Sequence, residues 1–295
     1  MTVESNTTDD GSGESLAPPK LTDEQILELD DDRFSPENVA LVTGAGSGIG
    51  RATAVALAAN GLTVAGLDID EDGLEETIAT AESLDTDGRV LAAPCDLTDD
   101  EAVRSAVDAA AQEGSVRYLA NIAGMQHIAA IAEFPMETYD FMQDLMLRAP
   151  FYLAQLVIPH IEATDDGVGA IGNMSSVHGH YATRDKPAYI TAKHGLTGLT
   201  RAIAAEGEGT LRGFSVSVGY VLTPLMVDQI QDTAEERGLS ETEVIEDVML
   251  GQARTKDMMT PIEVANLFVF GFSSHAKHLN GGDLLFDGGY TTTYE

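Results

Sequence analysis

The sequence predicts an α/β protein built on a single, doubly wound, Rossmann-type parallel sheet with helices on both faces. From residue 39 onward, short apolar runs alternate with longer amphipathic segments, a pattern typical of strands joined by crossover helices. A glycine-rich loop follows the first apolar run, as expected at the first strand-to-helix turn of such a sheet. No repeat or change of composition marks a second domain.

Seven apolar runs are the expected strands, and in chain order they are 39–44, 62–68, 89–96, 116–124, 169–176, 214–220 and 283–289. Helices are expected between them, most clearly at 48–61, 99–114 and 187–203. Another is expected at 260–274, where the apolar stripe fits either the core or a subunit interface. Residues 224–256 should form a helical lid that excludes water from a cleft.

The first 34 residues form an acidic extension, and we place the domain at 35–295. Residues 1–32 carry ten acids and a single lysine, Lys20, interspersed with Gly, Ser and Pro. This composition predicts disorder over residues 1–20 and, for the extension as a whole, a largely disordered segment. The sequence LTDEQILELDDDRF is the exception, since it could form a short helix or clamp on the domain surface.

The net charge of −33, with 49 acidic and 16 basic residues, excludes several partners. Nucleic acid and anionic membranes both require clustered cations, and only five residues are lysine. Acids spread along the whole chain indicate a surface adapted to concentrated salt. The single cysteine, Cys95, excludes an intrachain disulfide and a multi-cysteine metal site, and we expect no metal. Without a long apolar run or a secretory leader, we expect a cytoplasmic protein.

The loop ALVTGAGSGIGRATA predicts a dinucleotide site. Small residues let the backbone approach a pyrophosphate, and the helix N-terminus offers N–H donors; the loop residues are Gly44, Ser47, Gly48, Ile49 and Gly50. A tight turn with close helix packing is the alternative. Asp68 ends the second strand, where a carboxylate accepts hydrogen bonds from ribose hydroxyls and repels a 2′-phosphate, so NAD is favoured over NADP. Asp68 could instead cap a helix.

Further small or polar residues end the third and fourth strands at the same edge of the sheet. Asp96, beside Leu97, could meet the adenine, although a helix cap is equally compatible with its position. Asn121, Ala123 and Gly124 follow the fourth strand and suit a flat ligand lying across strand ends.

Ser176, Tyr189 and Lys193 are candidate catalytic residues. Tyr189 and Lys193 are one helical turn apart and share a face. A phenol titrates near pH 10, but an ammonium about 4 Å away, at an effective dielectric near 20, is worth roughly 4 kcal/mol, or up to about three pKa units. Lys193 could thus make Tyr189 a base and bind the nicotinamide ribose, while Ser176 holds the substrate oxygen. Each residue taken singly is more often structural.

These motifs resemble the short-chain dehydrogenase/reductase family over roughly residues 38–290. The resemblance is carried by TGAGSGIG, by NIAG, by the spacing Ser176–x12–Tyr189–x3–Lys193, and by LTP. It implies a tyrosine acid/base, a carboxamide contact from Thr223 and, since members are commonly tetramers, a homo-oligomer.

A narrower resemblance links the segments AGMQHIAAIAEFP, SSVHG, DKPAYITAKHGLTGLT and GYVLTPLMVDQI to the D-3-hydroxybutyrate dehydrogenases of that family. It implies NAD-dependent interconversion of (R)-3-hydroxybutyrate and acetoacetate, with a small hydroxy or keto acid held by Gln126, His178, Lys186 and Gln229. A small carboxylate needs charge-assisted hydrogen bonds, which fits a lysine at this point. Lys186 as a partner for a surface acid and His178 bonded to backbone are the alternatives.

Three positions depart from the family pattern. Ile122 stands where a second asparagine is usual, Met146 falls where the helix asparagine of the proton relay is expected, and Val218–Gly219 replaces Pro–Gly. These departures leave two other interpretations open: another short-chain dehydrogenase or 3-oxoacyl-thioester reductase, and a degenerate NAD-binding regulatory protein.

Overall fold

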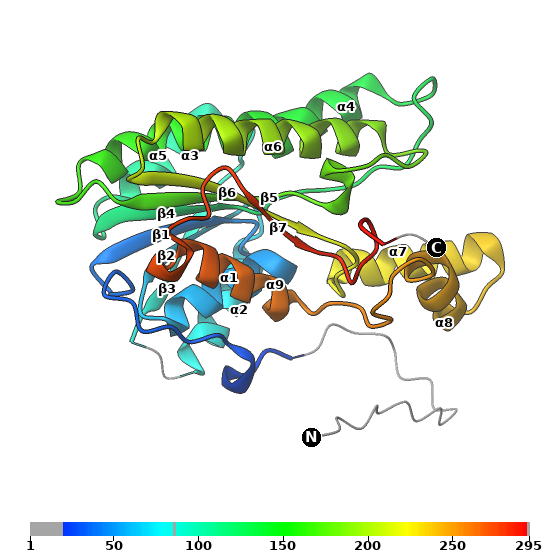
Figure 1. Cartoon of the computed structure of the whole chain (residues 1–295), viewed down its shortest axis with the longest axis horizontal. Helices are drawn as coiled ribbons and strands as arrows, with labels where there is room; N and C mark the ends of the chain where they lie inside the picture. Colours follow the sequence, from blue (N-terminus) through cyan, green and yellow to red (C-terminus); the bar gives the residue numbers. More distant parts are fainter. Residues whose placement is uncertain (1–19, 85–86, 294–295) are drawn as a thin grey trace.

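A seven-stranded sheet forms the centre of the molecule, with the strand order β3-β2-β1-β4-β5-β6-β7 (Figure 1). The structure is a computed structural model that describes residues 20–84 and 87–293. The strands are β1 (Asn38–Thr43), β2 (Thr63–Asp68), β3 (Arg89–Pro94), β4 (Ser115–Asn121), β5 (Gly169–Met174), β6 (Leu211–Val218) and β7 (Asp283–Phe286). Every adjacent pair is parallel, as predicted. Because strand order reverses between β1 and β4, a crevice opens there at the carboxyl ends.

Helices cover both faces of the sheet, which confirms the doubly wound prediction. In Figure 1 one face carries α1 (Gly48–Ala59), α2 (Glu71–Glu82) and α9 (Pro261–Phe272), and the other carries α3 (Asp100–Ala110), α5 (Ala149–Glu162) and α6 (Pro187–Glu206). Each face buries its own apolar cluster. The inner strands β1, β5 and β6 bury both of their faces, which explains why they read as continuous apolar runs rather than alternating ones.

The apolar stripe of α9 belongs to the core. Phe268 and Phe272 are fully buried against Phe214 of β6, with ring centroids 6.1 and 5.2 Å away. The seventh strand is shorter than expected and ends at Phe286, because Gly288 and Gly289 take φ values of +61° and +80° and turn the chain.

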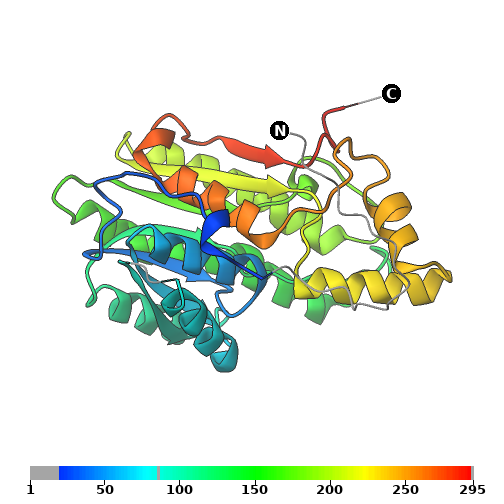
Figure 2. The same cartoon turned by 90° about the horizontal axis from the view of Figure 1, so that it is seen from below.

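A helical segment projects from the carboxyl edge of the sheet (Figures 1 and 2). It comprises α7 (Pro224–Arg237), α8 (Glu241–Glu243) and the π-turn Val244–Met249. Ile230, Val244 and Met249 give this segment a small apolar cluster distinct from the two main ones. The segment lies where the lid was expected, at 224–256; its movement over the cleft stays a prediction.

Residues 20–34, part of the acidic extension, are packed chain. Ile26 lies in the core cluster beside α1 and α9. Asn60 and Asn266 hydrogen-bond the backbone of this segment at Leu29 and Leu27, at 2.9 Å each. Asp31 accepts a hydrogen bond from the backbone N–H of Ser274. The expected surface clamp is therefore present. Disorder was predicted for residues 1–20, of which 1–19 lie outside the described residues. Among the described helices, none has the length and apolar character to cross a membrane.

Candidate active site

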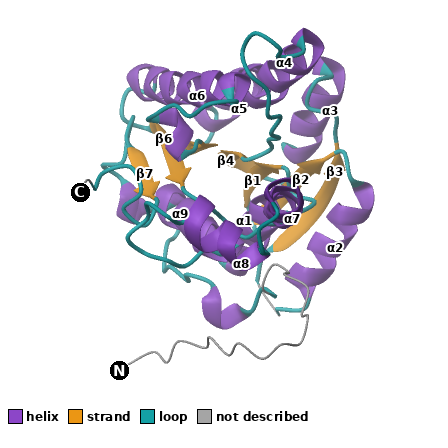
Figure 3. Ribbon diagram, turned by 90° about the vertical axis from the view of Figure 1, so that its right-hand side faces the viewer, coloured by secondary structure: helices purple, strands orange, loops and turns teal. Residues whose placement is uncertain are grey.

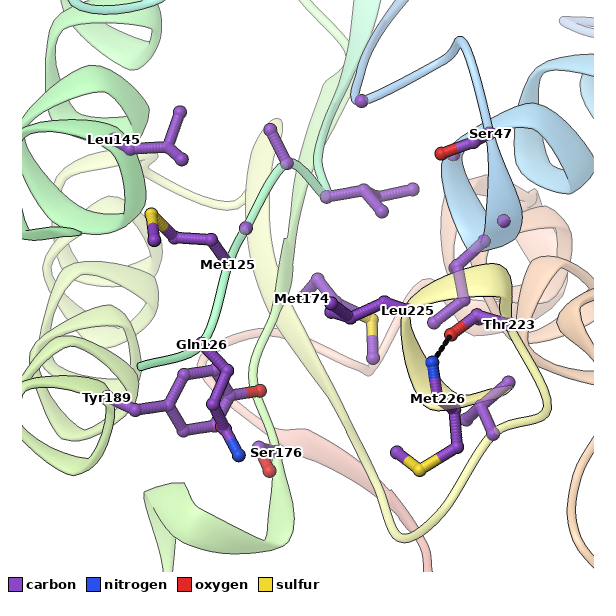
Figure 4. Close-up of a pocket in the computed structure, with 18 of the residues that line it drawn as sticks. Ser47, Met125, Gln126, Leu145, Met174, Ser176, Tyr189, Thr223, Leu225 and Met226 are labelled. Carbon is purple, nitrogen blue, oxygen red and sulfur yellow. Dashed lines mark hydrogen bonds between the residues drawn. The ribbon is translucent and has the colours of Figure 1, made fainter. Parts of the chain in front are cut away.

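Figure 3 looks onto the carboxyl edge of the sheet, with α6 on one side and α7 on the other. A cavity of about 470 Å³ opens at this edge and is lined by residues of α6 and α7. One wall carries Met125, Leu145 and Tyr189, and the opposite wall carries Thr223 and Leu225 (Figure 4). All the predicted site residues line it except Asn121. They are Gly44, Ser47, Gly48, Ile49, Gly50, Asp68, Asp96, Leu97, Ala123, Gly124, Gln126, Ser176, His178, Lys186, Tyr189, Lys193, Thr223 and Gln229.

The glycine loop leaves no room for side chains. A Cβ at Gly50 would lie 1.9 Å from the carbonyl oxygen of Gly44, and Gly44 itself has a φ of +70°. The loop therefore packs directly against α1, whose first residues, Gly48 to Gly50, line the cavity. Thr223 lies across from Gly48, at 3.4 Å from the position a Cβ would take there. This cradle fits the pyrophosphate of a dinucleotide.

Asp68 faces this loop rather than capping a helix. Its Oδ2 accepts a 2.8 Å hydrogen bond from the N–H of Gly46, and its Oδ1 accepts one of 3.0 Å from the N–H of Asp70. The cap of α2 is Asp70, which accepts from Gly73. Each carboxylate oxygen of Asp68 keeps a lone pair. Asp68 can therefore still accept hydrogen bonds from a pair of vicinal hydroxyls.

The two other strand-end acceptors behave differently. Asp96 closes a local turn by accepting from the N–H and hydroxyl of Thr98 at 2.8 and 2.7 Å, while Asp99 caps α3.

Asn121 lies behind the cavity. Its Nδ2 donates to Asn173 Oδ1 at 2.8 Å, and Asn173 donates to Thr200. This buried chain ties β4 and β5 to α6. Asn121 thus stabilises the wall, whereas Ala123 and Gly124 form the surface.

Ser176, Tyr189 and Lys193 line the same cavity. Ser176 follows β5, and the other two lie one turn apart on α6, so the sheet edge and the helix together position them. Ser176 lies close enough to the phenol of Tyr189 to affect its pKa, and Figure 4 shows both side chains beside Gln126. The Lys193 Nζ lies 5.3 Å from the centroid of the Tyr189 ring.

The pKa shifts of Tyr189 and Lys193 differ from those expected from the sequence. Lys193 is 3% exposed and donates from Nζ to the carbonyl of Met174 at 2.7 Å, and burial lowers its pKa to about 8. Burial also raises the pKa of Tyr189 above 10, and Ser176 opposes that shift only in part. The expected lowering of the phenol pKa by Lys193 is therefore absent. Activating Tyr189 requires positive charge beyond that of Lys193.

His178 and Lys186 lie at the far end of the same wall. His178 Nδ1 is 3.4 Å from Ser176 Oγ, and Nε2 is 3.0 Å from Thr183 Oγ1. Burial, together with the charges of Lys186 and His194, lowers the pKa of His178 to about 4. Burial also lowers the pKa of Lys186. Lys186 forms no ion pair with any carboxylate in the described parts of the chain.

An apolar cluster fills the space behind Tyr189. Met142 and Met146 are fully buried there with Ala188 and Ala192. At this point a π-turn, Asp144–Arg148, joins α4 (Met136–Gln143) to α5. Gln143 donates from Nε2 to the carbonyl of Ala188 at 2.9 Å, which pins the start of α6. No motif pointed to Gln143; its place in the same helix as Met146 was the available signal.

Comparison with known proteins decides the family. A family model described as enoyl-(acyl carrier protein) reductase matches residues 44–291. The chain is 35% identical over 254 residues to a D-beta-hydroxybutyrate dehydrogenase of Rhizobium meliloti, covering 85% of this chain and 98% of the relative. A protein of the same name from Cupriavidus necator is 34% identical over 255 residues, covering 85% of this chain and 96% of the relative. The protein belongs to the short-chain dehydrogenase/reductase family.

A solved structure supports the same assignment. L-Sorbose reductase from Gluconobacter frateurii, complexed with NADPH and L-sorbose, superposes with a TM-score of 0.82 at 27% identity, covering 89% of this chain and all of that one. As a short-chain dehydrogenase/reductase, the protein is an oxidoreductase that uses a nicotinamide cofactor, which accepts or donates the hydride. Among the residues described above, Gly44, Gly48, Gly50, Ser176 and Tyr189 all line the cavity.

Proposed function

We propose that the protein interconverts (R)-3-hydroxybutyrate and acetoacetate with NAD. The observation that carries the proposal is Lys186, which forms no ion pair among the described residues although the chain has 49 acidic residues against 16 basic ones. It lines the cavity together with Gln126 and Gln229 on the substrate side of Tyr189. Charge-assisted hydrogen bonds from such a set suit a small carboxylate, which offers little apolar surface.

The choice of NAD follows from Asp68. Its carboxylate lies at the end of β2 against the glycine loop, and it carries no cationic partner in the described part of the chain. A 2′-phosphate placed there would meet a negative charge instead of an arginine fork. Arg51, the basic residue nearest the loop in sequence, is engaged with the carbonyls of Gly46 and Gly73 and with Glu76.

The proposal is tested by following NADH absorbance in molar salt with (R)-3-hydroxybutyrate, its (S)-enantiomer and acetoacetate. Turnover of the (R)-acid and of acetoacetate, with NAD preferred to NADP, is the expected result. Turnover of a neutral alcohol but neither acid would overturn the substrate assignment. Reduction of acetoacetyl thioesters with NADPH, in preference to the free acid, would favour a 3-oxoacyl-thioester reductase instead.

A further inference from the structure

Gln126 and Lys186 reach the cavity from two separate loops. Gln126 lies on the loop between β4 and α4, and Lys186 lies directly before α6. Residues 122–130 and 181–186 contain no helix or strand, so no regular hydrogen-bonding pattern sets the distance between these two side chains. That distance depends on contacts between the loops.

A single backbone hydrogen bond ties the two loops together. The N–H of Ala129 donates to the carbonyl of Asp185 at 2.9 Å. Among the residues that the structure describes, no other hydrogen bond joins residues 124–134 to a different part of the chain. The donor lies three positions after Gln126, and the acceptor directly precedes Lys186. The loops are therefore joined beside the two side chains that line the cavity.

Asp185 presents its carbonyl to Ala129 through an uncommon backbone conformation. Its φ is +66°, and among the described residues other than glycine only Glu208 shares a positive φ. Aspartate and asparagine adopt this left-handed region more readily than other residues with a side chain, whereas a β-branched residue rarely does. The Asp185 side chain is exposed and forms no hydrogen bond or ion pair with any described residue. What the fold requires at this position is therefore the backbone conformation rather than the carboxylate.

We propose that Asp185 is a positioning residue for the substrate acid. Its left-handed backbone, together with the bond to Ala129, sets the distance between Lys186 and Gln126. The inference rests on the proposed function, in which both of these side chains bind the carboxylate. A charge-assisted hydrogen bond needs a short and aligned contact, so a shift of Lys186 relative to Gln126 weakens binding of an acid. A neutral alcohol makes no such contact, and Asp185 thereby contributes to the selection of an acid over a neutral alcohol.

The effect of Asp185 is confined to the acid-binding end of the cavity, because the start of α6 has a separate anchor. Lys186 takes a φ of −125° and a ψ of 38°, outside the helical region, and α6 begins only after it. In the first turn of α6, the carbonyl of Ala188 accepts a 2.9 Å hydrogen bond from Gln143 Nε2 of α4. A rotation of the backbone at Asp185 therefore moves Lys186 while Tyr189 keeps its place.

The test compares Asp185→Val, which disfavours a positive φ, with Asp185→Asn, which permits it and removes only the charge. Glu208→Val is the matched control, because it places the same strain beyond the other end of α6, outside the cavity. In Asp185→Val we expect the KM for 3-hydroxybutyrate to rise about tenfold, the lower end of the loss expected for a hydrogen bond to a charged group. The KM for NAD and the kcat/KM for butan-2-ol should not change. The other two variants should match the wild type in all three measurements.

Hydrogen exchange of the Ala129 amide, followed by NMR in the unliganded protein, reads the contact without turnover. The amide should be protected in the wild type and should exchange rapidly in Asp185→Val only. An unprotected amide in the wild type would overturn the proposal even if Asp185→Val does not fold. So would an unchanged KM for the acid in Asp185→Val, an equal increase in Asp185→Asn, or a parallel loss with butan-2-ol, which indicates a general structural role.

Failure of the proposed function gives a different result. In that case the wild type oxidises butan-2-ol but neither enantiomer of 3-hydroxybutyrate. The exchange rates of the Ala129 amide then still show whether the backbone of Asp185 maintains the contact between the two loops.

Discussion

Replacing Lys186 with alanine separates binding of the acid from binding of the cofactor. Lys186 precedes α6, but its side chain makes no capping hydrogen bond, so its removal leaves the helix start unchanged. A hydrogen bond to a charged group contributes about 1.5–3 kcal/mol, which corresponds to roughly 10- to 150-fold in affinity. We therefore expect the KM for 3-hydroxybutyrate to rise by about this factor, while the KM for NAD stays within about twofold.

The KM for the acid should depend on pH in the wild type but not in Lys186→Ala. Burial lowers the pKa of Lys186, and the protonated form is the one that binds a carboxylate. In the wild type the KM for the acid should therefore rise as pH increases through that lowered pKa. This rise should be missing in Lys186→Ala.

Initial-rate kinetics with 3-hydroxybutyrate and with neutral butan-2-ol provide the assay. Lys256→Ala is the control, since the Lys256 Nζ bonds only the carbonyls of Leu250 and Gly251, outside the cavity. Lys186→Ala should lose selectivity for the acid over the neutral alcohol, whereas Lys256→Ala should keep it. Equal increases of KM for the acid and for NAD would show that Lys186 does not bind the carboxylate.

Three other predictions follow from the same structure. Tyr189→Phe should lower kcat by at least about 10²-fold while the affinity for NADH, measured by fluorescence titration, is unchanged. Asp68→Asn should raise kcat/KM with NADP relative to NAD, because it removes the negative charge beside the glycine loop; an unchanged ratio would contradict the assigned role of Asp68. Asp31→Ala should lower the free energy of unfolding by about 1–3 kcal/mol, since it leaves the N–H of Ser274 unpaired. Burial raises the pKa of Asp31, but the hydrogen bonds from Ser274 and Arg33 outweigh burial and lower that pKa overall. The stabilisation of the fold by the Asp31 carboxylate is therefore present above its unfolded pKa near 3.8 and is lost as the pH falls below that value. Denaturant titrations at several pH values on both sides of 3.8 will check this.

Much of the cofactor site could be predicted because its chemistry is local. Gly44 and Gly50 are separated by one turn and one helix start. A Cβ at Gly50 would lie only 1.9 Å from the carbonyl oxygen of Gly44, so a side chain cannot fit there. Asp68 follows a buried strand, and parallel strands bring their carboxyl ends to one edge. Tyr189 and Lys193 share a helix face through a spacing of four. Each inference depends on a few neighbouring residues.

Side-chain direction could not be predicted in the same way. Asn121 ends β4 as expected, yet it points behind the cavity toward Asn173, a residue 52 positions away. Lys193 lies on the expected face of α6, but its Nζ turns to the carbonyl of Met174 at the end of β5. In both cases the partner comes from a distant segment, so only the packed arrangement determines which hydrogen bond forms.

The sequence alone determined the α/β sheet, the glycine-rich turn, the acidic composition and most of the residues that line the cavity, because period, spacing and residue type act over a few positions. Tertiary structure decided what those residues touch: residues 20–34 against α1 and α9, His178 between Ser176 and Thr183, and an apolar cluster behind Tyr189. These contacts join segments far apart in the chain. They depend on the packing of whole elements, which no local pattern records.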